Sequence, residues 1–162
     1  MSTAPVVRGT GRRVRRPKDL EALQERLRDS PAFETFSEAF IFAACLGFAR
    51  RKRIPFQKTA EAVPWEVFAG AGGEEIVNIL AVVETNELEI LADARLDERL
   101  KIFEEYLHGG LKIMEAELSS SPGTKIEDVV RDMVIAEKEQ SAEAGRPNLD
   151  RIAEDIARQM SP

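Results

Sequence analysis

The sequence predicts an all-α protein, and two observations support this prediction. Apolar residues recur at helical spacing along most of the 162 residues. No segment of strand length alternates convincingly between apolar and polar residues, so at most one short N-terminal strand is expected. Because 43% of the residues are apolar and 32% are charged, the chain can build a core, and a wholly disordered or disulfide-based protein is excluded.

The N-terminal region combines a basic arm with a first helix. Residues 1–17 carry no apolar period and predict a flexible arm, in which residues 12–17 suit a short extended strand closed by its proline. The next segment, residues 19–29, is predicted to be helical because three leucines share one face: Leu20, Leu23 and Leu27.

The most apolar segment, residues 33–49, predicts a helix that Thr35 or Ser37 caps. Its apolar residues cover nearly the whole circumference: Phe33, Phe36, Ala39, Phe40, Phe42, Ala43, Leu46, Gly47 and Ala49. A helix that is apolar on all sides is surrounded by protein. The segment is therefore expected to be either the central helix of the domain or half of a dimer core.

Glycines are predicted to interrupt the helices that follow. A short helix over residues 64–68 begins at a proline, and the glycine-rich residues 70–73 then break the chain. Apolar spacing resumes over residues 74–83 and again in a long helix over residues 97–118. Each glycine of the pair at 109–110 costs roughly 1 kcal/mol against alanine in a helix interior, so a break or kink is expected there.

The C-terminal part predicts two amphipathic helices behind a linker, residues 119–123. Thr124 and Asn148 cap these helices. The residues expected to face inward are Ile126, Val129, Val130, Met133 and Val134 in the first, and Leu149, Ile152, Ile156 and Met160 in the second. The predicted organisation is an arm, a helical core, a linker and a helical pair, at residues 1–17, 18–118, 119–123 and 124–162.

Charge is unevenly distributed along the chain. The net charge is −6, from 23 basic and 29 acidic residues. Residues 1–18 carry +6 and residues 49–60 carry +5, each without an acid, so the remainder carries −17. One interpretation is that the two basic segments contact a polyanion such as DNA, which responds to local positive charge. The alternative is a basic tail and a solvated loop without such a partner.

The sequence offers little support for catalysis. With one histidine, it has little of the usual general base, and no pair among its many carboxylates stands out. With one cysteine, it has no intrachain disulfide and no cysteine-based zinc site. His108 is interpreted as a helix-end residue before glycine, and Cys45 as a buried structural thiol. Residues 70–73 precede two glutamates rather than Lys-Ser/Thr, which argues against a phosphate loop. We expect a non-enzymatic protein without a cofactor or metal.

The compartment can also be predicted. The longest apolar run, residues 39–49, has about half the length of a membrane span. The N-terminus lacks the apolar core of a signal peptide. A lone cysteine is typical of a reducing environment, so we expect a cytoplasmic protein.

The order of the first elements resembles a ribbon–helix–helix arrangement. Residues 12–16 would be the strand, followed by the helices over residues 19–29 and 33–49. In such proteins, two chains pair their strands and insert them into the DNA major groove. Only Val14 is apolar among the five strand residues, which makes the strand a poor one. The interpretation predicts a homodimer whose arginines contact DNA.

Several phrases of the sequence together resemble one family. They are Arg13 to Lys18, Phe33 to Phe36, Phe42 to Phe48, Ile54 to Phe56, Pro64 to Phe68, and Ile102 to Leu111. Their order and spacing resemble the DNA phosphorothioation-associated proteins of the Dnd-system-associated protein 4 family, over residues 12–118. The resemblance implies a bacterial restriction and phage-defence system that replaces a non-bridging phosphate oxygen of DNA with sulfur. It implies no active-site residues, and it favours contact with DNA or with a DNA-bound partner.

Three functional hypotheses follow. The first is an accessory protein of such a system that binds duplex DNA, plain or phosphorothioated, through Arg12, Arg13, Arg15, Arg16, Lys18, Arg50, Arg51, Lys52 and Arg53. The second is an adaptor without DNA contact, in which the acidic body and Trp65 bind a larger protein of the system. Trp65 is the only tryptophan, and it either anchors this partner or fills a gap in the core. The third, an enzyme, has the least support.

Overall fold

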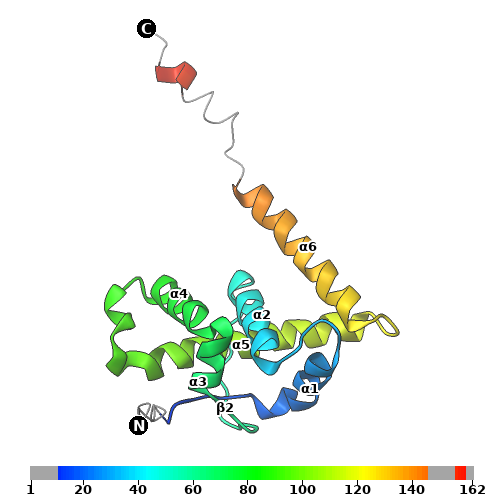
Figure 1. The fold of residues 1–162 in the computed structure, drawn as a ribbon. Helices are drawn as coiled ribbons and strands as arrows, with labels where there is room; N and C mark the ends of the chain where they lie inside the picture. Colours follow the sequence, from blue (N-terminus) through cyan, green and yellow to red (C-terminus); the bar gives the residue numbers. More distant parts are fainter. Residues whose placement is uncertain (1–10, 146–155, 160–162) are drawn as a thin grey trace, which may run out of the picture.

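The computed structural model describes residues 11–145 and 156–159, most of which are helical, with one two-stranded ribbon (Figure 1). The all-α fold class is therefore confirmed. The strands are β1 (Arg13–Val14) and β2 (Val63–Pro64). The helices are α1 (Glu21–Asp29), α2 (Phe36–Ala49), α3 (Trp65–Phe68), α4 (Glu74–Thr85), α5 (Leu96–Ser120) and α6 (Ile126–Gly145). Single helical turns lie at Lys18–Leu20 (η1), Ala69–Gly73 (η2), Leu88–Leu91 (η3) and Asp93–Arg95 (η4).

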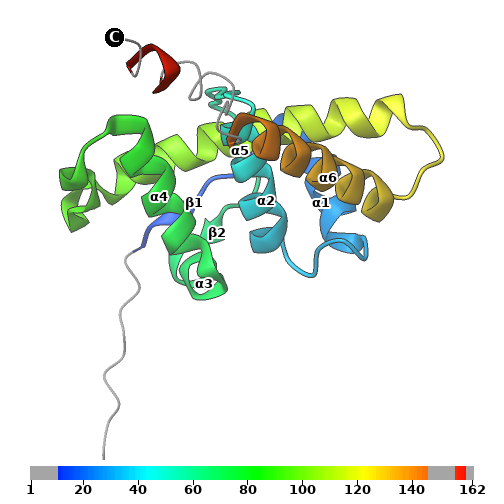
Figure 2. The ribbon, with the colours of Figure 1, turned by 90° about the horizontal axis from the view of Figure 1, so that it is seen from above.

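The central helix of the molecule is α5, against which α2 packs (Figures 1 and 2). Every residue of α5 from Ile102 to Leu111 is buried. The apolar segment over residues 33–49 forms α2, whose residues Phe40, Ala43 and Gly47 face α5. The opposite side of α2 is only partly covered, since Cys45 and Ala49 are exposed.

Glycines allow α2 and α5 to approach each other closely. A Cβ on Gly110 would lie 1.7 Å from the carbonyl oxygen of Ala43, and one on Gly47 would lie 2.1 Å from that of Tyr106. A Cβ on Gly109 would lie 1.7 Å from the carbonyl oxygen of Lys52. The predicted break at 109–110 is wrong, because α5 continues through both glycines. These glycines make room for neighbouring backbone rather than bending the helix.

The ribbon is formed within one chain. β1 pairs antiparallel with β2, with Val14 opposite Val63, and Pro17 bridges Thr59 further along. On its other edge, the backbone N–H of Arg15 donates to the Glu104 carboxylate. The strand pairing of the ribbon–helix–helix interpretation is therefore wrong for this chain, because β1 pairs with β2 of the same chain and not with a second β1.

Local signals behave as the sequence predicts at two other places. The Thr35 hydroxyl caps α2 by accepting from the N–H of Glu38 at 3.2 Å. The Glu38 carboxylate in turn accepts from the N–H of Glu34. In η2, Gly72 has a φ of 85°, so the chain changes direction between α3 and α4. This change of direction is the interruption expected at residues 70–73.

The last described helix, α6, projects from the body (Figure 1). Val129 and Met133 are its buried apolar residues, and Ile126 and Val130 pack beside them. Val134, which was expected to face inward, is 47% exposed, so that prediction is wrong. Most of the second predicted C-terminal helix, including Asn148, Leu149, Ile152 and Met160, lies outside the described residues. Ile156 is described, and it is 52% exposed.

Two single-residue predictions meet different outcomes. Cys45 is exposed, so its interpretation as a buried thiol is wrong, although partial burial still raises the pKa of this thiol. Trp65 is 7% exposed and packs beside Phe68, which fits the alternative that it fills the core. No helix in the described part of the chain is both long and apolar enough to cross a membrane.

Candidate nucleic-acid interface

The structure brings together the two basic segments that the sequence separates. Residues 12–18 pair antiparallel with residues 58–65, so the first basic segment meets the second at Lys58, and both segments contact α5. The N–H of Lys18 donates to the carbonyl of Lys58 at 2.9 Å, and the guanidinium of Arg15 lies 5.0 Å from the centre of the Phe56 ring. We call the exposed cations of these two segments the basic face: Arg13, Arg15, Lys18, Lys52, Arg53 and Lys58.

Glu104 of α5 holds the first basic segment, residues 12–18, against the helix through Arg15. Its Oε2 atom accepts from the backbone N–H of Arg15 at 2.7 Å and from the Nε–H of the same residue at 2.8 Å. The Glu104 side chain is 4% exposed and that of Arg15 is 40% exposed, so the carboxylate is covered while the guanidinium reaches solvent. Burial raises the pKa of Glu104 to about 7, despite the attraction of Arg15.

Glu105, the next residue of α5, anchors the second segment in the same way. Arg53 donates through Nε to Glu105 at 2.7 Å and through Nη1 to Glu84 of α4 at 2.9 Å. The other oxygen of Glu84 accepts from the hydroxyl of Tyr106. Burial and this negatively charged acceptor together raise the pKa of Tyr106 to about 12. The network fixes Arg53 at the surface above a buried acid.

His108 lies where both segments meet α5. One ring nitrogen contacts the carbonyl of Ile54 and the other contacts the carboxylate of Asp19, each at 3.1 Å. Burial alone would raise the pKa of Asp19, but hydrogen bonds from Lys112 and His108 outweigh it and lower that pKa. His108 is buried in the middle of α5, so its placement at a helix end is wrong, and both of its ring nitrogens have partners.

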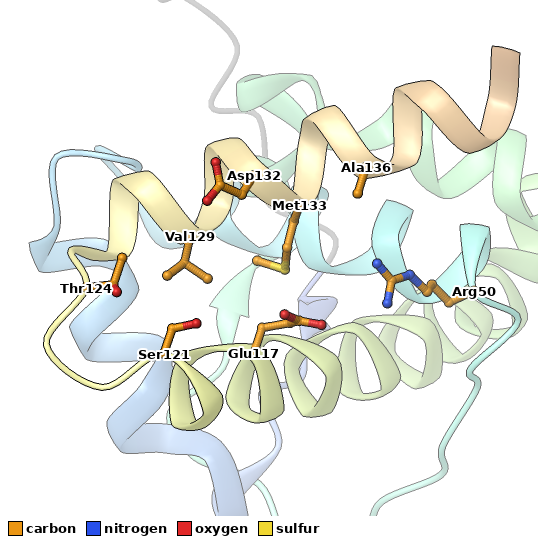
Figure 3. Close-up of a pocket in the computed structure, with 8 residues that line it drawn as sticks. All are labelled: Arg50, Glu117, Ser121, Thr124, Val129, Asp132, Met133 and Ala136. Atoms are coloured by element: carbon orange, nitrogen blue, oxygen red, sulfur yellow. The ribbon is translucent and has the colours of Figure 1, made fainter.

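The cations named from the sequence occupy different environments. Arg12 forms an ion pair with Asp97, and Lys18 pairs with Glu21. Arg16 is 5% exposed, donates to Gln24 and lies 4.1 Å above the Phe36 ring, so it belongs to the core. Arg50 points towards α6 and pairs with Glu137, away from the basic face (Figure 3). Three of the named residues are exposed and form no ion pair among residues 11–145: Arg13, Arg51 and Lys52.

Sequence reasoning missed three cations near this surface. Lys58 is exposed beside Lys18, and its signal was already present, because it lies in the acid-free stretch over residues 49–60. Lys101 and Lys112 come from α5 itself, where Lys101 lies 4.0 Å from Glu105 and Lys112 lies 3.0 Å from Asp19. The local sequence around Lys101 and Lys112 does not indicate that they lie near the basic segments, because only the tertiary fold places them there.

The arrangement suits the binding of an anion. The acids on this side of α5 are each held by a cation, and no group of three potential ligands among the described residues could hold a metal ion. The guanidinium groups of Arg15 and Arg53 are fixed by carboxylates beneath them while part of each side chain remains exposed. Fixed guanidinium groups suit phosphate, which accepts several parallel N–H bonds.

Comparison with known families decides the context of this surface. Residues 13–152 match the family model of the DNA sulphur modification system-associated protein 4. The chain belongs to this family. The match includes β1, the basic face and α6, and it confirms the resemblance seen in the sequence phrases. No curated protein and no solved structure gave a match. Membership associates the chain with a DNA sulphur modification system, in an accessory role.

Proposed function

We propose that this protein is a non-enzymatic accessory protein that contacts duplex DNA of its sulphur modification system through the basic face. The observation that carries the proposal is the joining of two acid-free segments along α5, above the buried carboxylates of Glu104 and Glu105. The association of the family with a DNA sulphur modification system favours DNA as the ligand of this face. The buried acids orient the cations, and the exposed cations neutralise phosphates.

The N-terminal basic segment is part of the folded body and cannot be deleted without damage to the core. Removing residues 1–17 would delete Val14, which is fully buried, and β1 with it, so loss of DNA binding after truncation would not be informative. Charge reversal at exposed positions avoids this problem. Arg13, Lys52 and Lys58 are exposed and form no ion pair within the described part of the chain, so glutamate at these positions should leave the core intact.

The experiment measures duplex DNA affinity by fluorescence anisotropy across a salt series. The variant R13E/K52E/K58E should bind more weakly, and its slope of log K against log salt should be shallower by about 3, one for each lost phosphate contact. A matched control is K138E, which changes an exposed lysine of α6 on another part of the molecule. Equal slopes for the wild type and the triple variant, or an equal loss in K138E, would show that the basic face does not bind DNA.

The same assay separates plain from phosphorothioate duplexes. A difference in affinity between the two would give the protein a role in reading the modification, whereas equal affinity would limit it to general DNA contact. If the wild type binds neither duplex at low salt, the adaptor hypothesis replaces the proposal.

A further inference from the structure

His108 links both basic segments to α5 from inside the fold. Its side chain is 6% exposed, so the ring lies beneath the basic face and not on it. Nδ1 of the ring lies 3.1 Å from the carbonyl oxygen of Ile54, in the second basic segment, residues 49–60. Nε2 lies 3.1 Å from Oδ2 of Asp19, which directly follows the first basic segment. One side chain therefore contacts the chain beside each segment.

Both contacts require a proton on the ring nitrogen. A backbone carbonyl can only accept a hydrogen bond, so Nδ1 must donate to Ile54. Oδ2 of Asp19 also lies 3.0 Å from Nζ of Lys112, so this oxygen already accepts from an ammonium group. Burial would raise the pKa of Asp19, but the hydrogen bonds from Lys112 and His108 lower it, and an ionised carboxylate can only accept. Nε2 must therefore donate as well.

A neutral ring cannot make both contacts. Neutral imidazole has one N–H, whereas imidazolium has two. Loss of one proton would leave a nitrogen lone pair facing an oxygen atom, either that of Ile54 or that of Asp19. Because the ring is buried, little water is at hand to replace the lost hydrogen bond. The geometry is that of a positively charged His108.

Charged groups from three elements surround the ring. Asp19 comes from η1, and Lys112 and Glu104 lie one helical turn to either side of the ring in α5. The Phe56 ring is centred 5.2 Å from the imidazole, and the guanidinium of Arg15 lies 5.0 Å from the centre of that Phe56 ring. Glu104 is bound to Arg15, so Asp19 is the acid that neutralises the imidazolium.

The two contacts fix the backbone next to cations of the basic face. The N–H of Ile54 donates to the carbonyl of Glu105 at 3.0 Å, and its own carbonyl accepts from the ring, so both backbone polar groups of this residue are bound to α5. The preceding residue is Arg53, whose guanidinium is fixed by Glu105. Asp19 directly follows Lys18, the last cation of the first basic segment. The protonated ring therefore holds the chain beside both Lys18 and Arg53.

We propose that His108 is a positioning residue of the basic face: as an imidazolium it clamps both basic segments to α5, and DNA binding is coupled to one proton on this ring. The inference rests on the proposed DNA contact and adds its regulation by pH. Phosphates above the face favour the positive ring, and the positive ring keeps the cations in place for the phosphates. DNA affinity should therefore fall as the pH rises through the range in which the ring loses its proton.

The variant Asp19→Asn isolates this proton. In D19N, the side-chain amide can donate to a neutral ring, so both contacts form without the second proton. The Asp19 side chain is 47% exposed, so the variant should fold, which circular dichroism checks. Loss of the acid raises DNA affinity by the same factor at every pH, so the result is read from the shape of the pH profile.

The experiment measures duplex DNA affinity by fluorescence anisotropy between pH 6 and pH 8 at fixed salt. The ratio of wild-type to D19N affinity should fall by about threefold or more over this range, and a single linked proton limits the fall to about tenfold per pH unit. Glu104, whose pKa is raised to about 7, titrates in both proteins, so its influence cancels in the ratio. The matched control is E21Q, which also removes one acid near the first basic segment, but one that pairs with Lys18. Its profile should stay parallel to that of the wild type.

The protons of the ring can also be counted directly, because His108 is the only histidine of the chain. In a nitrogen–proton NMR spectrum of the full chain at about pH 6.5, close to the usual histidine pKa, the wild-type ring should show two slowly exchanging N–H protons, one for each contact. In D19N, the Nε2 proton should be absent.

Each outcome decides a different part of the inference. Parallel pH profiles of wild type and D19N, with DNA binding intact, would refute the coupling and leave the proposed function standing. A single ring N–H proton in the wild type would refute the imidazolium. Absence of DNA binding at every pH would overturn the proposed function and the coupling together, while the NMR count would still decide the charge of the ring.

Discussion

Gly110→Ala tests the closest contact of the fold, the crossing of α2 and α5. The added Cβ would lie 1.7 Å from the carbonyl oxygen of Ala43, whereas Cβ atoms are essentially never found within 3.0 Å of another heavy atom. The two backbones must therefore separate by about 1.3 Å or more at this point. A gap of 0.5–1 Å already forfeits about a quarter to a half of the dispersion energy of each contact pair that it opens.

The expected loss of stability follows from these numbers. Overpacking in a well-packed core costs typically about 1–3 kcal/mol, and the obstacle here is a backbone carbonyl that cannot rotate away. The gain in helix propensity from glycine to alanine is about 1 kcal/mol. We expect the overpacking cost to lie near its upper end, about 3 kcal/mol. Subtracting the propensity gain of about 1 kcal/mol leaves a net destabilisation of about 2 kcal/mol.

Urea unfolding followed by circular dichroism measures the effect. With a slope of about 2 kcal/mol per molar urea, the midpoint of G110A should fall by about 1 M. The control is G70A, because a Cβ on Gly70 meets nothing within 4 Å, and its midpoint should stay equal or rise. A G110A protein as stable as the wild type would refute the argument that a glycine is required at this crossing.

Three further predictions concern single side chains. The raised pKa of Glu104, from 4.5 to about 7, means that its stabilising contribution is complete below pH 4.5 and is lost as the pH rises through 7, a loss of about 3 kcal/mol. E104Q stays neutral, so its free energy of unfolding relative to wild type should increase between pH 4.5 and pH 8, and parallel pH profiles would contradict this. T35A removes the hydroxyl that caps α2 and should cost about 1 kcal/mol in urea unfolding. Y106F removes the hydroxyl that donates to Glu84, so the Glu84 pKa measured by NMR should rise, because this hydrogen bond is the largest influence that lowers it.

The sequence itself determined the helical class, the approximate positions of the strongly periodic helices and the family. Apolar spacing along residues 33–49 and 97–118 is local information, as are the cap at Thr35 and the change of direction at residues 70–73. The two acid-free basic segments were also visible in the sequence, because charge can be counted without a fold. Local periodicity and charge are properties of neighbouring residues, and these parts of the prediction therefore held.

Only the tertiary structure decided what the glycines, the histidine and the arginines do. Gly109 and Gly110 predict a kink when α5 is considered alone, and they become contact points once α2 and Lys52 lie against them. His108 acquires its partners from Ile54 and Asp19, which are far away in sequence.

The same limit applies to the arginines of the N-terminal segment. Arg15 reaches solvent above Glu104, while its neighbour Arg16 enters the core beside Gln24 and Phe36. Adjacent residues of identical type separate in this way because side chains alternate across an extended backbone, and the sequence does not show which side α1 and α2 will cover. Partners contributed by distant segments exist only after folding, so composition and spacing cannot reveal them.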